Sequence, residues 1–94
     1  MATYNVTRVK HATLSASTVD TVNLSHPDVK VNVFNRGSSD IYVTLDGTTP
    51  TVAGDNTFIV PANTARRFGL GVYAVAAVKL ISASTPPYTV ESLG

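Results

Sequence analysis

The sequence predicts an all-β protein: an antiparallel two-sheet sandwich or small barrel of about seven short strands with Greek-key-like connections. Three observations lead to this prediction. Apolar and polar residues alternate with a period of two in short runs along the whole chain. Turn-forming residues, chiefly Gly, Pro, Asn and Asp, separate these runs. Valine, threonine and serine are frequent, which is typical of pleated, half-buried strands.

The 94 residues are enough for one domain and too few for two, so we expect a single domain over residues 1–94. The net charge of +1 provides no field that would gather nucleic acid or an anionic membrane. No cysteine is present, which excludes disulfides and thiolate metal sites. Met1–Asn5 lacks the pattern of a secretory signal, and the apolar stretch Gly69–Val78 is too short to span a bilayer.

The N-terminal quarter is expected to hold two or three strands. The first is predicted over Thr3–Val9, where apolar residues alternate with polar ones. Alternation continues over Thr13–Leu24, but its apolar phase slips by one residue near Thr18. Because a β-bulge or a chain reversal produces such a slip, this segment is predicted to be two strands or one bulged strand.

The central segment shows the clearest alternation. Val29–Val33 and Ile41–Leu45 place apolar residues at every second position, and turn formers fill the loop between them, Asn35–Asp40. We therefore expect these two strands to pair as an antiparallel hairpin. The residues expected to face the core from this pair are Val31, Val33, Ile41, Val43 and Leu45.

Asp46–Asn56 is predicted to be a long loop, because it contains Asp-Gly and Gly-Asp pairs and a proline that cannot donate to a central ladder. Pro86 and Pro87 predict a rigid, non-pairing connector before the last strand. Alanine's helix propensity makes a helical turn over Ala74–Val78 the alternative to a strand there. Strands are expected at Thr57–Val60, Arg66–Leu70, Tyr73–Ser82 and Tyr88–Leu93.

No pattern in the sequence indicates a catalytic site. His11 and His26 are the side chains that titrate near neutral pH, but neither has a partner at a spacing that would build an acid–base pair. Ser25–Asp28 contains the residue types of a hydrolase triad. Neighbouring residues project in divergent directions, however, so this segment is expected to be a turn. We therefore expect no catalytic residues and a protein that is not an enzyme.

Three aspartates are the candidates for a cation site. Asp40, Asp46 and Asp55 lie in predicted loops, but their spacing does not match a calcium-binding loop. Aspartate in such turns is usually there to accept hydrogen bonds from its own backbone. We expect no metal-binding and no cofactor-binding residues.

Three residues are candidates for binding a partner. Arg66 and Arg67 form the one adjacent basic pair, and arginine binds carboxylates through paired hydrogen bonds. Tyr42 has the opposite phase to Ile41 and Val43, so it is expected to point outward and to support a binding face. A solvated strand edge and an ordinary rim aromatic are the alternative interpretations of these positions.

Several segments resemble small structural proteins of tailed bacteriophages. Together they cover about two-thirds of the chain. They consist of turn and strand residues, which other sandwiches share. The segments are Val31–Gly37, Ile41–Thr44, Asp46–Thr57, Val60–Ala62, Val78–Ser82 and Tyr88–Glu91.

Members of that group are virion components, often capsid decoration proteins on the outside of the head. The resemblance implies a phage structural protein that is made in the bacterial host cytoplasm and stabilises the head lattice by non-covalent binding. The implied partners are the major capsid protein or other virion proteins, and the family favours a trimer. The apolar run Gly71–Val78 exceeds what one short strand requires, which also favours a homo-oligomer.

The segment Tyr42–Pro50 also resembles a strand-turn motif of immunoglobulin-like accessory domains in bacterial glycoside hydrolases. A carbohydrate-binding or immunoglobulin-like accessory module is therefore the alternative function. Tyr42 would stack on the sugar, and nearby loop aspartates would bond to it. The lack of tryptophan argues against this alternative.

Overall fold

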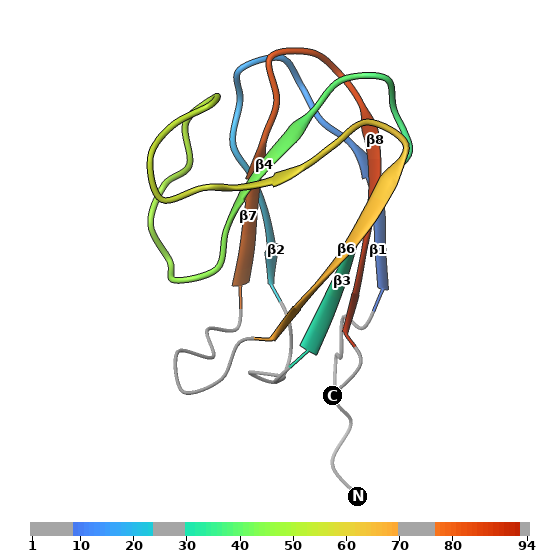
Figure 1. The fold of residues 1–94 in the computed structure, drawn as a ribbon, viewed down its shortest axis with the longest axis vertical. Helices are drawn as coiled ribbons and strands as arrows, with labels where there is room; N and C mark the ends of the chain where they lie inside the picture. The colour runs from blue at the N-terminus through green and yellow to red at the C-terminus, as the bar shows by residue number, and fades with distance from the viewer. Residues whose placement is uncertain (1–8, 24–29, 70–76, 93–94) are drawn as a thin grey trace, which may run out of the picture.

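The computed structural model describes residues 9–23, 30–69 and 77–92, which form eight strands in two antiparallel sheets of four (Figure 1). The predicted two-sheet sandwich is therefore confirmed. Within these ranges, no helix has the length and apolar character needed to cross a membrane. The strands are β1 (Val9–Thr13), β2 (Asp20–Asn23), β3 (Lys30–Asn35), β4 (Ile41–Thr44), β5 (Phe58–Val60), β6 (Thr64–Gly69), β7 (Ala77–Ile81) and β8 (Pro87–Ser92).

The strand order is nested. Sheet A has the order β1-β8-β3-β6, and sheet B has the order β2-β7-β4-β5. The first strand thus pairs with the last, the second with the seventh, the third with the sixth and the fourth with the fifth. This is the connectivity of a jelly roll, in which two Greek keys share one core. The pair β4–β5 is the one hairpin among the described strands.

The predicted hairpin between β3 and β4 is wrong. Strand β3 pairs with β6 and β8 in sheet A, whereas β4 pairs with β5 and β7 in sheet B. The turn between β3 and β4 therefore crosses from one sheet to the other. Alternation shows which residues of each strand face the core, but two strands that face the same core from opposite sheets alternate just as two paired strands do.

The predicted connector at Pro86–Pro87 also differs from the structure. Pro87 lies in β8 opposite Thr13, and its carbonyl accepts a hydrogen bond from Arg36 N at 3.0 Å. The Pro86 carbonyl accepts one from Leu14 N, also at 3.0 Å. Proline lacks a backbone donor but keeps its acceptor, so these two residues take part in pairing through oxygen alone.

Within Thr13–Leu24 the described residues hold only the last residue of β1 and one complete strand, β2, so the prediction of two strands or one bulged strand there is wrong. Strand β1 ends at Thr13, a turn with Ser17 at φ 54° follows, and β2 begins at Asp20. Residues 77 and 78 belong to β7, not to a helix. The remainder of the predicted first strand, Thr3–Arg8, and residues 70–76 lie outside the described residues.

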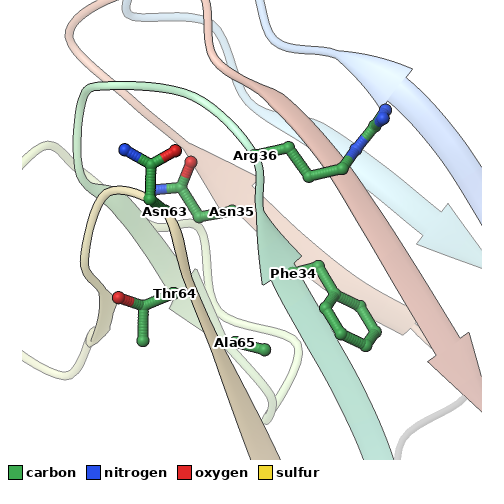
Figure 2. A pocket seen from close by; sticks show the side chains of 6 residues that line it. All are labelled: Phe34, Asn35, Arg36, Asn63, Thr64 and Ala65. Atoms are coloured by element: carbon green, nitrogen blue, oxygen red, sulfur yellow. The ribbon is translucent and has the colours of Figure 1, made fainter.

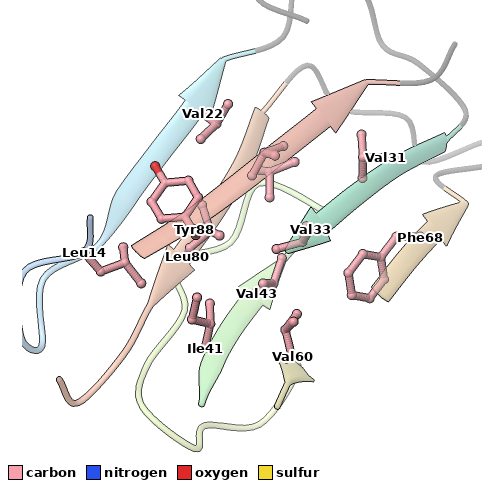
Figure 3. Packing of buried hydrophobic residues seen from close by; sticks show 12 residues of the cluster. Leu14, Val22, Val31, Val33, Ile41, Val43, Val60, Phe68, Leu80 and Tyr88 are labelled. Atoms are coloured by element: carbon pink, nitrogen blue, oxygen red, sulfur yellow. The ribbon is translucent and has the colours of Figure 1, made fainter. Parts of the chain in front are cut away.

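The core lies between the two sheets and receives residues from both (Figure 3). Val31, Val33, Ile41 and Val43, which the alternation predicts to be buried, are all 0% exposed. Leu45 is partly buried against the same cluster. The other buried residues of the cluster are Leu14, Val22, Val60, Phe68, Val78, Leu80, Tyr88 and Val90.

Two buried polar groups join the sheets at one end of the core. The Tyr88 hydroxyl of sheet A donates a hydrogen bond to the Asp20 carboxylate of sheet B. The Asn35 side-chain amide donates to the carbonyls of Ser39 (2.7 Å) and Val60 (2.9 Å). Because Val60 ends β5, the Asn35 bond holds that strand against the turn that leaves β3.

Candidate protein-interaction surface

Strands β5 and β6 are the free edges of the two sheets on one flank of the sandwich. They contact each other and are joined by the short turn 61–63. Large apolar side chains are exposed there, since Phe58 is 46% and Ile59 is 44% exposed. Neighbouring residues of a strand point to opposite faces, so these two side chains together wrap the free edge of β5. We call Tyr42, Phe58, Ile59 and Arg66 the β5–β6 flank.

Arg66 spans the space between the edge strands β6 and β5 with its side chain. It lies opposite Val33, so its side chain leaves β6 toward the interior and reaches across to β5. Its guanidinium lies 5.0 Å from the ring centroid of Phe68 and 5.9 Å from that of Phe58. Its Nη1 also donates to the carbonyl oxygen of Ile59 at 2.8 Å.

These contacts hold the Arg66 guanidinium in one place while leaving the residue exposed. The guanidinium carbon lies within cation–π distance of both rings, and one of the five N–H groups donates to Ile59. The bond also occupies a carbonyl on the free edge of β5, which reduces that edge's capacity to pair with another strand. The flank is therefore a preorganised surface that combines apolar area with a cation.

Tyr42 lies on the outer face of sheet B, as the alternation predicts. It sits between Ile59 on β5 and Ile81 on β7 in the register of the sheet, and it is half-buried. Ile81, Tyr42 and Ile59 therefore form a row across the outer face of sheet B, and the row ends at the exposed edge strand β5. The structure thus places Tyr42 and Arg66 on either side of the same strand.

Arg67 lies elsewhere. It is opposite Asn32 on the outer face of sheet A and donates from Nε to Asn32 Oδ1 at 3.3 Å. The adjacent arginines therefore project to opposite faces of β6, which follows from the two-residue period of a strand. They do not form one basic site.

Phe58 and Ile59 are not among the binding residues that the sequence predicts. A usable signal is present, because Phe58-Ile59-Val60 is a run of three apolar residues in a short strand between turns. A strand that is half-buried has room for two of these in the core at most, so the run requires an exposed apolar residue or a covered outer face. Which residue is exposed depends on β5 being an edge.

The carboxylates of Asp46 and Asp40 accept hydrogen bonds from groups in the loops. Asp46 Oδ1 accepts hydrogen bonds from the backbone N (3.1 Å) and hydroxyl (2.6 Å) of Thr48, and its Oδ2 accepts one from Asn56 Nδ2 (3.0 Å). The hydroxyl of Thr48, followed by the Asn56 amide, lowers the pKa of Asp46 from 3.8 to about 2. Asp40 Oδ1 accepts from Ala62 N at 3.2 Å. Asp46 thus bonds to its own turn, as the sequence predicts, whereas Asp40 bonds to the turn between β5 and β6.

His11 lies on β1, and its Nδ1 is 2.7 Å from the hydroxyl of Thr89. His26 lies outside the described residues. In the ranges that the structure describes, no three side chains of His, Asp or Glu gather in a way that would hold a metal ion.

Comparisons with known proteins assign no family to the chain: no protein-family model matches it, and no curated protein is significantly similar to it.

Proposed function

We propose that the chain is a virion structural protein of a tailed phage, a capsid decoration protein that binds the head lattice through the β5–β6 flank. The observation that supports this most is the exposed pair Phe58 and Ile59 beside a stacked Arg66. Aromatic residues and arginine are enriched at the centres of protein interfaces, where they contribute most of the binding energy.

The jelly-roll connectivity is compatible with this role. Viral capsid proteins and lectins both use this architecture, so the fold favours assembly or sugar binding without separating them. Binding to the assembled lattice and not to free subunits would stabilise the shell by mass action. The family resemblance implies that the protein acts as a trimer, with the major capsid protein or other virion proteins as its partners.

Sugar binding is the second candidate. A sugar platform requires a flat aromatic surface with hydrogen-bonding groups beside it. Tyr42 is half-buried between two isoleucines, and the Asp46 carboxylate is engaged with Thr48 and Asn56. Neither arrangement favours a sugar over a protein partner.

The test is cosedimentation of the full chain with empty heads purified from the phage that encodes it. We expect the native chain to pellet with the heads, and Ile59→Lys to reduce binding at least about tenfold, because it places an ammonium group in an apolar contact. Val9→Lys is the matched control, since Val9 is also an exposed apolar strand residue, 48% exposed, and lies in sheet A.

Three outcomes would contradict the proposal. The native chain could fail to pellet with heads, the control could lose binding as completely as Ile59→Lys, or the chain could be retained on cellulose or chitin and not on heads. The last result would favour the carbohydrate-binding alternative.

A further inference from the structure

We propose that copies of this chain associate head to tail, with the loop between β4 and β5 of one copy seated in a depression on the outer face of sheet A of the next. The proposal rests on the proposed function for its premise that the protein works in several copies. It specifies the two surfaces through which the copies contact each other. Neither surface includes a residue that defines the β5–β6 flank, although the loop adjoins it at Thr57 and the depression adjoins it at Ala65.

The depression lies at the end of β3 and the start of β6 (Figure 2). Its volume is about 360 Å³. The turn 61–63 and the turn after β3 bound it, and a hydrogen bond from Asn63 N to the Gly37 carbonyl (3.1 Å) joins them. Phe34 and Ala65, opposite each other in the register, form an apolar floor. The full lining is Phe34, Asn35, Arg36, Asn63, Thr64 and Ala65.

The face around the depression is basic. Residues of β3 and β6 that share the phase of Phe34 point outward, and these include Lys30 and Arg67. Arg36 continues the same phase beyond β3, beside Pro87. Glu91 on β8 is the one acidic side chain on this face among the described residues. The outer face of sheet A therefore has an excess of positive charge.

The loop that would enter the depression has the complementary character. Residues 45–57 contain two carboxylates, Asp46 and Asp55, and no basic residue. Val52 is exposed near the middle of this loop, at 37%. The loop thus presents an apolar side chain between two acidic ones. The depression has an apolar floor with Arg36 in its lining, and Arg67 lies two residues farther along β6 from Ala65 on the same face.

Internal hydrogen bonds preorganise the loop for docking. Asn56 and Thr48 bond to Asp46 at one end, and Thr57 Oγ1 donates to the Gly54 carbonyl at 2.6 Å at the other. Lys79 Nζ donates to the Gly47 carbonyl at 3.1 Å, which attaches the loop to sheet B. An ordered loop loses less conformational entropy on binding than a flexible one.

The position of the two surfaces requires a head-to-tail contact. The loop extends outward from sheet B (Figure 1), whereas the depression is lined by residues at the end of β3 and the start of β6, on the outer face of sheet A. A copy therefore cannot exchange loop and depression with a single partner as a two-fold dimer would. Contacts of this kind generate closed rings when the rotation between copies closes.

Sedimentation of the full chain at increasing concentration, without phage heads, tests the association. Asp55→Lys alters the loop, and Ala65→Glu places a carboxylate in the depression. We expect each to weaken association about tenfold or more, because each brings like charges together. Asn23→Lys, on the exposed part of β2, should associate as the native chain does. Circular dichroism checks that all variants are folded.

Mixing the two variants tests the head-to-tail geometry. The Asp55→Lys chain keeps a native depression and the Ala65→Glu chain keeps a native loop, so one native contact can form between them. The other contact pairs the lysine introduced in the loop with the carboxylate introduced in the depression, so we expect the mixture to recover oligomers larger than a dimer, while each variant alone stays monomeric. Larger oligomers of native chain should also dissociate as salt is raised.

A native chain that is monomeric at every concentration would overturn the inference, as would variants that associate like the native chain. A mixture that stays monomeric would overturn the head-to-tail contact. These results are distinct from those for the proposed function. A monomer that still pellets with phage heads contradicts this inference alone, and an oligomer that does not pellet contradicts the function alone.

Discussion

Tyr88 is the residue that most directly joins the two sheets. Its ring is fully buried in the core, and its hydroxyl crosses to the Asp20 carboxylate on β2. A hydrogen bond to a charged acceptor is stronger than one between neutral groups. Burial, and then the hydrogen bond and the charge of Asp20, raise the pKa of the Tyr88 phenol well above its ordinary value of 10.

Tyr88→Phe removes this bond while keeping the ring, and we expect it to lower the free energy of unfolding by about 2 kcal/mol near pH 8. The difference should shrink above pH 10. There the unfolded native chain releases the Tyr88 proton and the folded chain keeps it, so the native protein loses stability by about 1.4 kcal/mol per pH unit from this group. The Phe variant has no such proton. Urea unfolding between pH 8 and 11 measures the free energy of unfolding of the native chain and of Tyr88→Phe. A difference between the two that does not change with pH would contradict this account.

At the scale of elements, the turn between β3 and β4 decides how the sheets are placed. Asn35 organises it by donating to Ser39 and Val60 and by accepting from Gly37 N at 3.0 Å. Gly37 then passes so close to the chain before β8 that a Cβ atom there would lie 2.4 Å from Pro86 Cβ and 2.7 Å from Pro86 Cα. The turn is packed against a rigid proline, and this packing directs β4 into sheet B.

Gly37→Ala is therefore expected to destabilise the protein by about 2–3 kcal/mol through overpacking. Gly47→Ala is the comparison. Gly47 has φ 87° and nothing lies within 4 Å of a Cβ built there, so its substitution should cost about 1 kcal/mol from backbone strain alone. Thermal melting of both variants should place Gly37→Ala below Gly47→Ala. The reverse order would mean that the contact with Pro86 is readily relieved.

At the scale of the whole molecule, one core connects all eight strands. The nested pairing joins segments that are far apart in sequence, with β1 beside β8 and β3 between β8 and β6. Neither sheet has a hydrophobic core of its own, since both bury their inner faces against the other. The described strands should consequently unfold together.

Val31→Asp tests this cooperativity. Val31 is 0% exposed, and an unpaired carboxylate at that position costs several kcal/mol, against a total stability of roughly 5–14 kcal/mol for a chain of this size. We expect the variant to be unfolded, with hydrogen exchange protection lost in sheet B as well as in sheet A. Asn32→Asp, its neighbour on the outer face between Arg67 on β6 and Glu91 on β8, introduces the same charge at an exposed face and should stay folded. Protection that persists in sheet B of the Val31→Asp variant would contradict a single cooperative core.

The local features of this protein follow from its sequence. The two-residue period placed Val31, Val33, Ile41 and Val43 in the core and Tyr42 outside it, because the direction of a side chain depends only on its position within its own strand. Turn chemistry likewise located the loop around Asp46, since aspartate bonds to backbone groups within a few residues of itself.

The neighbours of each strand, and with them the candidate surface, depend on how the whole chain folds. The partner of β3 is β6 and not β4, and β5 is an edge that leaves Phe58 and Ile59 exposed. Arg66 and Arg67 point to opposite faces because of the strand period, and the tertiary structure decides what each contacts, Ile59 for Arg66 and Asn32 for Arg67. Pairing is set by how distant segments close one shared core, and alternation within a segment is the same whichever strand lies beside it.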